Sequence, residues 1–319
     1  MRLLIVGLGV QGQKRKIHAG KDFVASVDPI NPAAEFTNIA QVPLSDYDAV
    51  CLCTPEKQKT EIISYLIKNR KHVLVEKPLW VENLQVLQQL QAEAQAKAVV
   101  CYTAYNHRFE PHIKKMYEVL SSGVLGTVYY CRLFYGNGTA NVVKNSPWRD
   151  QGAGVLLDLG SHLFNIIDYW FDAAKTNTIT YKMTASDSFE TQAPDHVIIN
   201  SDKKSLAIAL EMSLVSWRNE FTCDIIAEKG SAHIRSLCKW GPSEFIYRQR
   251  VMPSGYPIEE KITLTEADPT WQQEYNFFKQ LCANHHTTDL RFDINFMHIM
   301  SQLTAKPLLE PKEKVCSLI

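Results

Sequence analysis

The chain has 319 residues, and its 34 Lys and Arg residues balance 34 Asp and Glu residues, so the formal net charge is zero. A hydrophobic fraction of 45% and a charged fraction of 21% are typical of a soluble globular protein with one or two domains. The charge balance gives no support for a general affinity for nucleic acid or acidic membranes. No apolar run approaches the roughly 18 residues of a membrane-spanning helix.

The cysteine and histidine patterns argue against metal sites and disulfides. None of the eight cysteines forms a Cys-x-x-Cys pair. Cys51 and Cys53 alternate in a strand-like run, so we expect small buried side chains and, as the simplest setting, a reducing cytoplasm. His285 and His286 are adjacent, so their side chains diverge, and no third ligand is evident. The sequence therefore predicts no metal.

The N-terminal stretch predicts a strand, a glycine loop and a helix in that order. Leu3–Val6 is apolar and ends at the loop Gly7-Leu8-Gly9-Val10-Gln11-Gly12, and residues 13–19 are the predicted helix. The first glycine permits the turn, the second lets the backbone approach a pyrophosphate, and the third lets the helix pack on the strand. The free N–H groups of the helix start favour phosphate. Lys14, Arg15 and Lys16 are most simply a solvated helix face.

The second predicted strand indicates which dinucleotide this loop would bind. Phe23–Val27 ends at Asp28, about 20 residues after the loop, where a carboxylate accepts the ribose hydroxyls. Pro29, Ile30 and Asn31 follow, with no cation for a 2′-phosphate. We therefore expect NAD, with NADP the less favoured cofactor.

Strands and helices continue to alternate up to residue 102, which is typical of a doubly wound parallel sheet. Strands are expected at residues 49–53, 71–75 and 98–102, and helices at 57–69 and 81–96. The first of these strands ends at Thr54 and Pro55, and the next at Glu76-Lys77-Pro78. Lys77 thus follows the carboxyl end of a strand, the edge where ligands bind in such sheets.

From about Tyr105 the pattern changes to consecutive strands, which suggests an antiparallel or mixed sheet. Helices are predicted at residues 111–121, 156–171, 271–282 and 291–304, with a polar loop at 137–146. Strands are predicted at 128–135, 178–184, 197–200, 206–214, 221–227, 232–236 and 244–249. The segment from Gly154 to His162 leads into the helix predicted at 156–171 and contains Asp158 and His162.

With these motifs in order, the chain resembles the Gfo/Idh/MocA family of nicotinamide-dependent oxidoreductases over nearly its whole length. The resemblance rests on the glycine loop with Asp28, on Thr54-Pro55, on Glu76-Lys77-Pro78 and on three further features. These are Tyr105-Asn106-His107-Arg108-Phe109 with Pro111, Gly123-Val124-Leu125-Gly126, and the pattern Gly-x-Leu-x-Asp-x-Gly-x-His up to His162.

The resemblance implies an α/β fold in which an N-terminal Rossmann doubly wound parallel sheet precedes an α+β domain with a large, mostly antiparallel open sheet. We expect a dinucleotide-binding domain at residues 1–104 and a substrate-binding and oligomerisation domain at 105–319, whose last helix can pack back on the first domain. It also implies a homodimer or homotetramer through the C-terminal sheet, and a small-molecule substrate such as a sugar, cyclitol or nucleotide sugar.

The chain also departs from the family pattern at two places. A histidine is frequent shortly after the Thr-Pro, where this chain has Glu56, Lys57 and Gln58. An acid is common three residues after the motif histidine, and here that residue is Asn165. These departures leave the substrate open.

Hydride transfer from an alcohol needs a base for the hydroxyl proton, and a histidine with a pKa near neutrality can serve. We expect His162 to be the acid/base and Lys77 to stabilise the developing alkoxide and bind the cofactor ribose. The i, i+4 spacing of Asp158 and His162 would let the carboxylate orient the imidazole or bind substrate. Taken alone, His162 could be a satisfied histidine at a helix start, and Asp158 a helix cap.

The remaining predicted site residues surround this trio. Thr54, Pro55, Glu76 and Asn106 are expected at the cofactor. Arg108, Trp148 and Arg149 are expected at the substrate, although Arg108 could equally hold a carboxylate between domains and Trp148 could be core. Tyr105, His107 and His112 are expected to be packing or surface residues.

Two other functions stay open at this point. One is a reductase of a non-sugar carbonyl or a bilin-like substrate. The other is a non-catalytic NAD(P)-binding sensor, against which the complete set Lys77, Asp158 and His162 argues.

Overall fold

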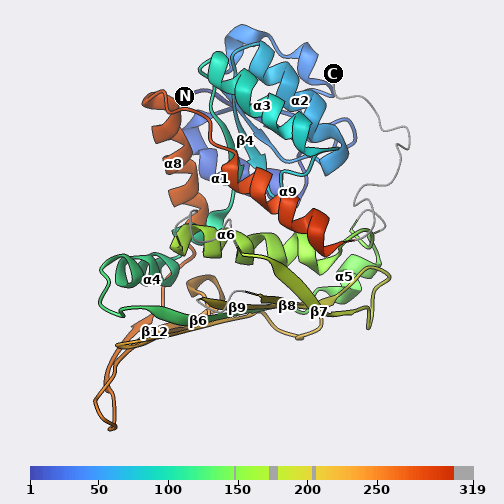
Figure 1. Ribbon diagram of the computed structural model, residues 1–319. Coiled ribbons are helices and arrows are strands. Elements are labelled where there is room, and N and C mark those ends of the chain that lie inside the picture. The colour runs from blue at the N-terminus through green and yellow to red at the C-terminus, as the bar shows by residue number, and fades with distance from the viewer. Residues whose placement is uncertain (147–148, 172–178, 203–205, 305–319) are drawn as a thin grey trace. The chain divides into compact units, whose positions relative to one another are not determined.

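A computed structural model describes residues 1–146, 149–171, 179–202 and 206–304 (Figure 1). The chain divides into two compact units. The first contains Met1–Asn106 and Trp271–His298, and the second contains His107–Thr270 and continues from Ile299. The roles assigned to residues 1–104 and 105–319 stay predictions.

A five-stranded parallel sheet forms the centre of the first unit. Its strand order is β2-β1-β3-β4-β5. The strands are β1 (Leu3–Val6), β2 (Phe23–Val27), β3 (Ala49–Leu52), β4 (His72–Glu76) and β5 (Cys101–Ala104). Every residue of β1 and β3 is buried, as expected for strands that are covered on both faces. The predicted doubly wound parallel sheet is confirmed.

The helices of this unit bury mainly apolar side chains, except the first, whose buried residues are Gly12, Arg15 and Ala19. They are α1 (Val10–Ala19), α2 (Glu56–Lys68), α3 (Leu84–Ala96), α8 (Thr270–Ala283) and α9 (Arg291–Leu303) (Figure 1). In α2 the buried residues include the predicted stripe Ile62, Ile63, Leu66 and Ile67. Tyr275 and Phe278 of α8 join Leu3 and Ile5 of β1 in one buried cluster. Full burial of a side chain such as Phe278 contributes about 1.5–3 kcal/mol.

The second unit contains an eight-stranded sheet of order β13-β12-β11-β10-β6-β9-β8-β7. Only β6 and β9 pair in parallel, and the other pairs are antiparallel, which confirms the expected sheet type. Helices α4 (Pro111–Ser121) and α6 (Ser161–Trp170) lie along one face (Figure 1). The strands are β6 (Val128–Gly136), β7 (Tyr181–Asp187), β8 (His196–Ser201), β9 (Ala207–Ser213), β10 (Glu220–Ala227), β11 (Gly230–Arg235), β12 (Ser243–Gln249) and β13 (Ile258–Leu264).

Two elements differ from the sequence prediction. The stretch expected to be a loop contains the short helix α5 (Ala140–Lys144). The edge strand β13 was not predicted, although Ile258, Ile262 and Leu264 share one of its faces, and none of its residues is buried. Backbone pairing with β12 and cross-strand ion pairs of Arg248 with Glu259 and of Lys261 with Glu244 hold it instead.

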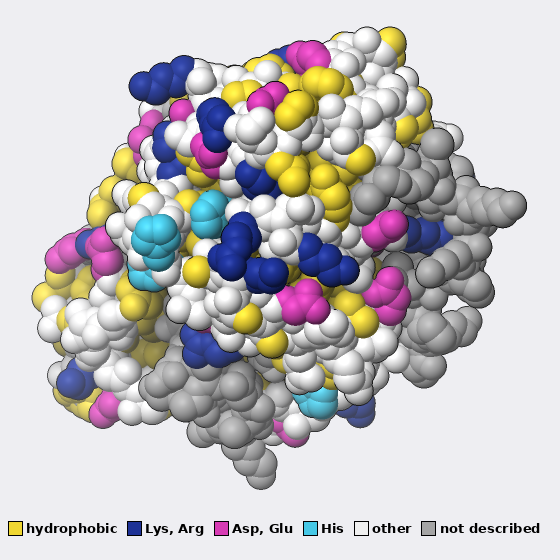
Figure 2. Space-filling view, turned by 90° about the horizontal axis from the view of Figure 1, so that it is seen from above, with side chains coloured by type: hydrophobic (Ala, Val, Ile, Leu, Met, Phe, Trp, Pro, Cys, Tyr) yellow, Lys and Arg dark blue, Asp and Glu magenta, His cyan; other side chains and the backbone are white. Residues whose placement is uncertain are grey.

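On the face drawn in Figure 2, several Lys and Arg side chains gather near the centre, with Asp, Glu and hydrophobic side chains beside them. Among the residues that the structure describes, no helix is both long and apolar enough to span a bilayer.

Asp293 is a carboxyl group buried in the first unit, where α9 packs near the end of β5. Thr103 Oγ1 donates a hydrogen bond to its Oδ2 at 3.1 Å. Burial nevertheless raises the pKa of Asp293 to about 7, because water no longer solvates the charged form. The folded chain therefore holds this proton in a range of pH in which the unfolded chain releases it.

We predict that the free energy of unfolding decreases between about pH 4 and pH 7 by up to about 4 kcal/mol through this one group, because the unfolded carboxyl ionises first. Asp293→Asn cannot ionise and should remove that part of the slope, so the variant is more stable than the parent at pH 8. Urea unfolding across the pH range measures the slope. Asp289→Asn, at a half-exposed carboxyl, is the control and should keep it. Equal slopes in the parent and Asp293→Asn would contradict the prediction.

Candidate active site

The glycine loop after β1 forms an open cradle. Gly7 has φ +89°, a conformation that favours glycine. A Cβ on Gly12 would overlap the carbonyl oxygen of Gly7, so α1 can approach the strand only with glycine at that position. A Cβ on Gly9 would meet nothing within 4 Å, and Gly9 is the N-cap residue of α1. Val10 and Gln11 follow in the exposed first turn. This space beside free helix N–H groups fits a pyrophosphate.

Asp28 follows β2 directly and is held by the backbone. Its Oδ2 accepts a hydrogen bond from the Leu8 N–H at 2.7 Å, and its Oδ1 accepts from Ile30 and Asn31 at 2.9 Å each. Burial alone would raise the pKa of Asp28, but these three N–H groups lower it below the usual value. The carboxylate is thus ionised beside the glycine loop, as an acceptor for ribose hydroxyls requires.

The ends of β3 and β5 add further predicted residues to this edge of the sheet. Thr54 is buried after β3, and among the described residues its Oγ1 has no hydrogen-bond partner. A buried hydroxyl without a partner is costly unless a ligand or water bonds to it. Pro55 is the N-cap residue of α2, and Asn106 is buried just after β5. The edge therefore fits a dinucleotide.

Glu76 ends β4 and forms a buried ion-pair network. Arg15 Nε lies 2.6 Å from Glu76 Oε1, and Arg15 Nη2 lies 2.8 Å from Glu274 Oε2 on α8. Burial would lower the pKa of Arg15, but the two carboxylates raise it well above its usual value. The interpretation of Arg15 as part of a solvated helix face is wrong, because its side chain is only 2% exposed. Lys77 follows Glu76 and is half-buried.

In the second unit, the segment with the Asp–His pattern begins with a π-helical turn, Leu156–Gly160, that continues into α6. Asp158 lies inside this turn, so its interpretation as a helix cap is wrong. Its Oδ2 is 3.2 Å from Nη2 of Arg149, which places that predicted substrate residue beside it. His162 is buried in the first turn of α6.

His107 belongs to the surroundings of His162, although the sequence suggested a packing or surface role. The two imidazole rings have centroids 3.9 Å apart, and the Tyr135 ring lies 6.2 Å from that of His162. Lys239 Nζ is 3.0 Å from His107 Nε2. Lys239 escaped the sequence analysis because it lies in a short turn between β11 and β12, far along the chain from His107, and no motif marks it. The His162 ring thus lies against a second imidazole, which in turn contacts a lysine.

The other two residues predicted at the substrate are Arg108 and Trp148. The Arg108 guanidinium lies 5.0 Å from the centre of the Tyr169 ring, a cation–π contact. Its Nε is buried without a hydrogen-bond partner among the described residues. Trp148 lies outside the described residues.

The predicted residues therefore form two groups. The cofactor residues and Lys77 gather at the carboxyl edge of the parallel sheet in the first unit, whereas Arg108, Arg149, Asp158 and His162 belong to the second unit. Within the described part of the chain, no three His, Cys, Asp or Glu side chains are grouped to hold a metal ion.

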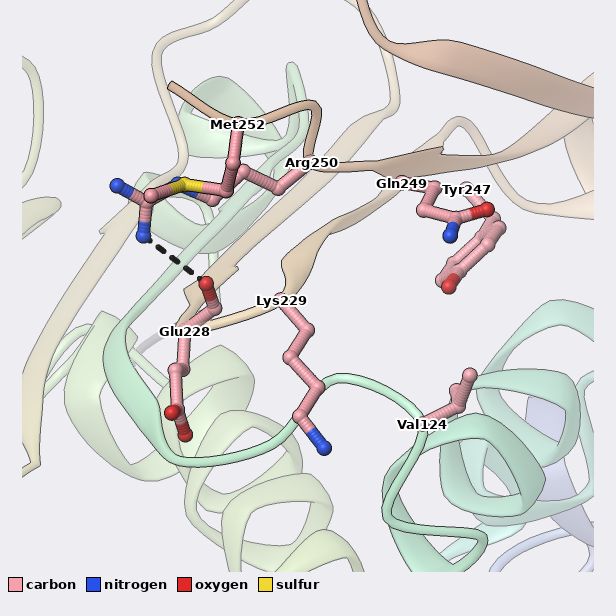
Figure 3. A pocket seen from close by; sticks show the side chains of 7 residues that line it. All are labelled: Val124, Glu228, Lys229, Tyr247, Gln249, Arg250 and Met252. Atoms are coloured by element: carbon pink, nitrogen blue, oxygen red, sulfur yellow. Dashed lines mark hydrogen bonds between the residues drawn. The ribbon is translucent and has the colours of Figure 1, made fainter. Parts of the chain in front are cut away.

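A separate pocket of about 450 Å³ lies in the second unit, away from these residues (Figure 3). Arg250 Nη1 donates to the Glu228 carbonyl at 3.0 Å across one side of it. Its walls include strongly exposed side chains such as Met252, so it is a surface hollow, and none of the predicted site residues lines it. The lining residues are Val124, Glu228, Lys229, Tyr247, Gln249, Arg250 and Met252.

Comparison with family models gives matches to both parts of the chain. A model described as the oxidoreductase family with an NAD-binding Rossmann fold matches residues 1–105. A model described as the GFO/IDH/MocA C-terminal domain matches residues 113–233.

Individual proteins are similar at lower identity. Trans-1,2-dihydrobenzene-1,2-diol dehydrogenase of Bos taurus is 24% identical over 234 residues, which cover 73% of this chain and 68% of that protein. The structure of UDP-N-acetylglucosamine 3-dehydrogenase GnnA from Acidithiobacillus ferrooxidans has a TM-score of 0.75 at 16% identity, covering 95% and 96% of the two chains. Levoglucosan dehydrogenase in complex with NADH has a TM-score of 0.76 at 16% identity, covering 95% of both. The two structures show the same fold.

The glycine loop gives a matched pair of variants for stability. Gly12→Ala should destabilise the chain by at least about 2 kcal/mol, because the new methyl group overlaps the backbone of Gly7. Gly9→Ala should change stability by less than about 1 kcal/mol, because the space around it is open. Chemical unfolding measures both. Equal losses in the two variants would show that the close approach of α1 to β1 is not the constraint.

Proposed function

Because the chain belongs to the Gfo/Idh/MocA family of oxidoreductases, we propose that it transfers a hydride between NAD and a carbon–oxygen bond of a polyhydroxylated small molecule. The observation that supports this most directly is the cofactor edge, where the Gly9 cradle, the Asp28 carboxylate and the Thr54 hydroxyl, which has no partner among the described residues, lie at adjacent strand ends.

The cofactor residues divide the binding of NAD among them. The loop Gly7–Gly12 and the start of α1 hold the pyrophosphate, and Asp28 accepts from the adenosine ribose. Thr54, Pro55, Glu76 and Asn106 line the same edge. When bound, NAD supplies the hydride acceptor or donor.

Three side chains handle the hydroxyl proton and the reacting oxygen of the substrate. His162 takes the hydroxyl proton or returns it, since a neutral imidazole can do this near neutral pH. Lys77 binds the reacting oxygen and stabilises its negative charge as the hydride leaves. Asp158, paired with Arg149, orients His162 or binds a substrate hydroxyl. Arg108 belongs to the substrate side.

The substrate class is proposed from the similar proteins, which are dehydrogenases of trans-1,2-dihydrobenzene-1,2-diol, UDP-N-acetylglucosamine and levoglucosan. A sugar, cyclitol, nucleotide sugar or related diol is therefore the substrate that we favour. A cytoplasmic location and a homo-oligomer through the eight-stranded sheet stay predictions.

Native mass spectrometry of the purified chain with NADH, followed by absorbance at the NADH band with these compound classes, tests the proposal. Cofactor binding and an absorbance change with one class support it. Binding without turnover of any class, bilins included, favours a sensor. Failure to bind either NADH or NADPH would overturn the proposal.

Replacement of the proposed acid/base is the sharper test of mechanism. His162→Asn should lower kcat by roughly 10²–10⁴-fold, because asparagine cannot accept the proton. The effect should appear in steady-state kinetics with little change in NADH affinity. His286→Asn, at an exposed histidine, is the control and should keep full turnover. Full turnover in His162→Asn would remove that residue from the mechanism.

Cofactor choice can be tested at Asp28. Asp28→Ser removes the ribose acceptor and the negative charge that opposes a 2′-phosphate, so NADH should bind at least about 10-fold more weakly while the preference over NADPH shrinks. Isothermal titration with both dinucleotides gives the ratio. Because the serine also loses backbone hydrogen bonds, thermal unfolding accompanies the titration. An unchanged ratio in a folded variant would show that Asp28 does not select the cofactor.

A further inference from the structure

Lys59 is a buried lysine in the first turn of α2, with a side chain only 1% exposed. Its Nζ donates hydrogen bonds to the carbonyl of Glu76 at 2.6 Å and to the carbonyl of Pro78 at 2.8 Å. The same nitrogen lies 3.7 Å from Glu56 Oε1. The two carbonyl groups that Lys59 binds therefore belong to the residues immediately before and after Lys77.

Burial of the charged Lys59 side chain costs free energy. A buried ammonium loses its hydration, and burial lowers the pKa of Lys59, an effect that Glu56 and Glu76 oppose and that Lys77 strengthens. Two short charge-assisted hydrogen bonds and a nearby carboxylate offset the loss. An apolar side chain would fill the same space without that cost, but it would leave two buried carbonyls without this donor.

A second contact restrains the same turn from another helix. Arg15 of α1 holds the carboxylate of Glu76, while Lys59 of α2 holds its carbonyl. The residue before Lys77 is thus bound through both its side chain and its backbone, and the residue after Lys77 through its backbone. The backbone on which Lys77 stands has little freedom to shift.

We propose that Lys59 is a positioning residue that fixes the turn Glu76–Pro78, so that the amine of Lys77 meets the cofactor ribose and the reacting oxygen in a single geometry. The inference rests on the role of Lys77 in the proposed function. Its physical basis is that a group acting in the transition state must be held to within about 0.5 Å, which a side chain on a mobile turn cannot achieve.

A double-mutant cycle on NADH binding tests the inference without a known substrate. Lys59→Met, Lys77→Met and the double variant are titrated with NADH by calorimetry, and kcat is added for any compound that the parent turns over. Lys59→Met should weaken NADH binding and lower kcat by about 10-fold each. In the Lys77→Met background the same change should have less than about a 2-fold effect, because Lys59 acts through Lys77.

Three outcomes separate this inference from the proposed function. Losses that multiply in the double variant would overturn the positioning role and leave the role of Lys77 intact. A folded Lys59→Met with unchanged NADH affinity and kcat would also overturn it. Lys77→Met with unchanged binding and turnover would instead show that Lys77 has no role, and the proposed mechanism would fail with it.

Two further variants control for stability. Lys57→Met changes an exposed lysine in the same turn of α2 and should leave NADH binding and kcat as in the parent. Lys59→Gln keeps amide donors without a charge and should retain more NADH affinity than Lys59→Met. It replaces Lys59→Met in the cycle if that variant does not fold. Equal NADH affinity in folded Lys59→Gln and Lys59→Met would contradict a role through the two carbonyl hydrogen bonds.

Discussion

Burial of the parallel sheet on both faces is the constraint on which the first unit depends. The strands β1 and β3 have no exposed residue, so polar side chains can reach solvent or a ligand only at the strand ends. Gly7, Asp28, Thr54 and Glu76 all occupy such positions. The cofactor edge is therefore a consequence of how the sheet is covered, because the same burial that stabilises the strands confines the chemistry to one edge.

The same constraint explains why charged side chains at this edge are paired. Arg15 bridges Glu76 and Glu274, and Lys59 binds the carbonyls on both sides of Lys77. Buried charges are stable only with partners. Removal of one partner leaves the other charge buried, and its desolvation is then not compensated. These networks tie α1, α2 and α8 to the turn that follows β4, and they make that turn a rigid part of the first unit.

The second unit is built on an open sheet. Helices α4 and α6 cover one face, and the histidine of the Gly-x-Leu-x-Asp-x-Gly-x-His pattern lies buried in the first turn of α6. A π-helical turn before α6 places Asp158 next to Arg149, while His107 lies against His162 and Lys239 lies against His107. The His162 imidazole therefore lies in a buried cluster with His107 and Tyr135.

The sequence by itself determined the order of strands and helices in the first unit, the glycine loop with Asp28, and the family, because each depends on local periodicity and on motifs of fixed spacing. The tertiary structure decided what buries Arg15 and Lys59, since their partners come from other elements and nothing in their own segments distinguishes them from solvated helix residues. It decided that His107 lies against His162, and that α8 packs on the parallel sheet although it follows the second sheet in the chain. Strand β13 is also a tertiary result, because it is held by pairing with β12 while none of its own residues is buried. A pattern of apolar residues shows that an element packs against something, but only the folded chain shows which element that is.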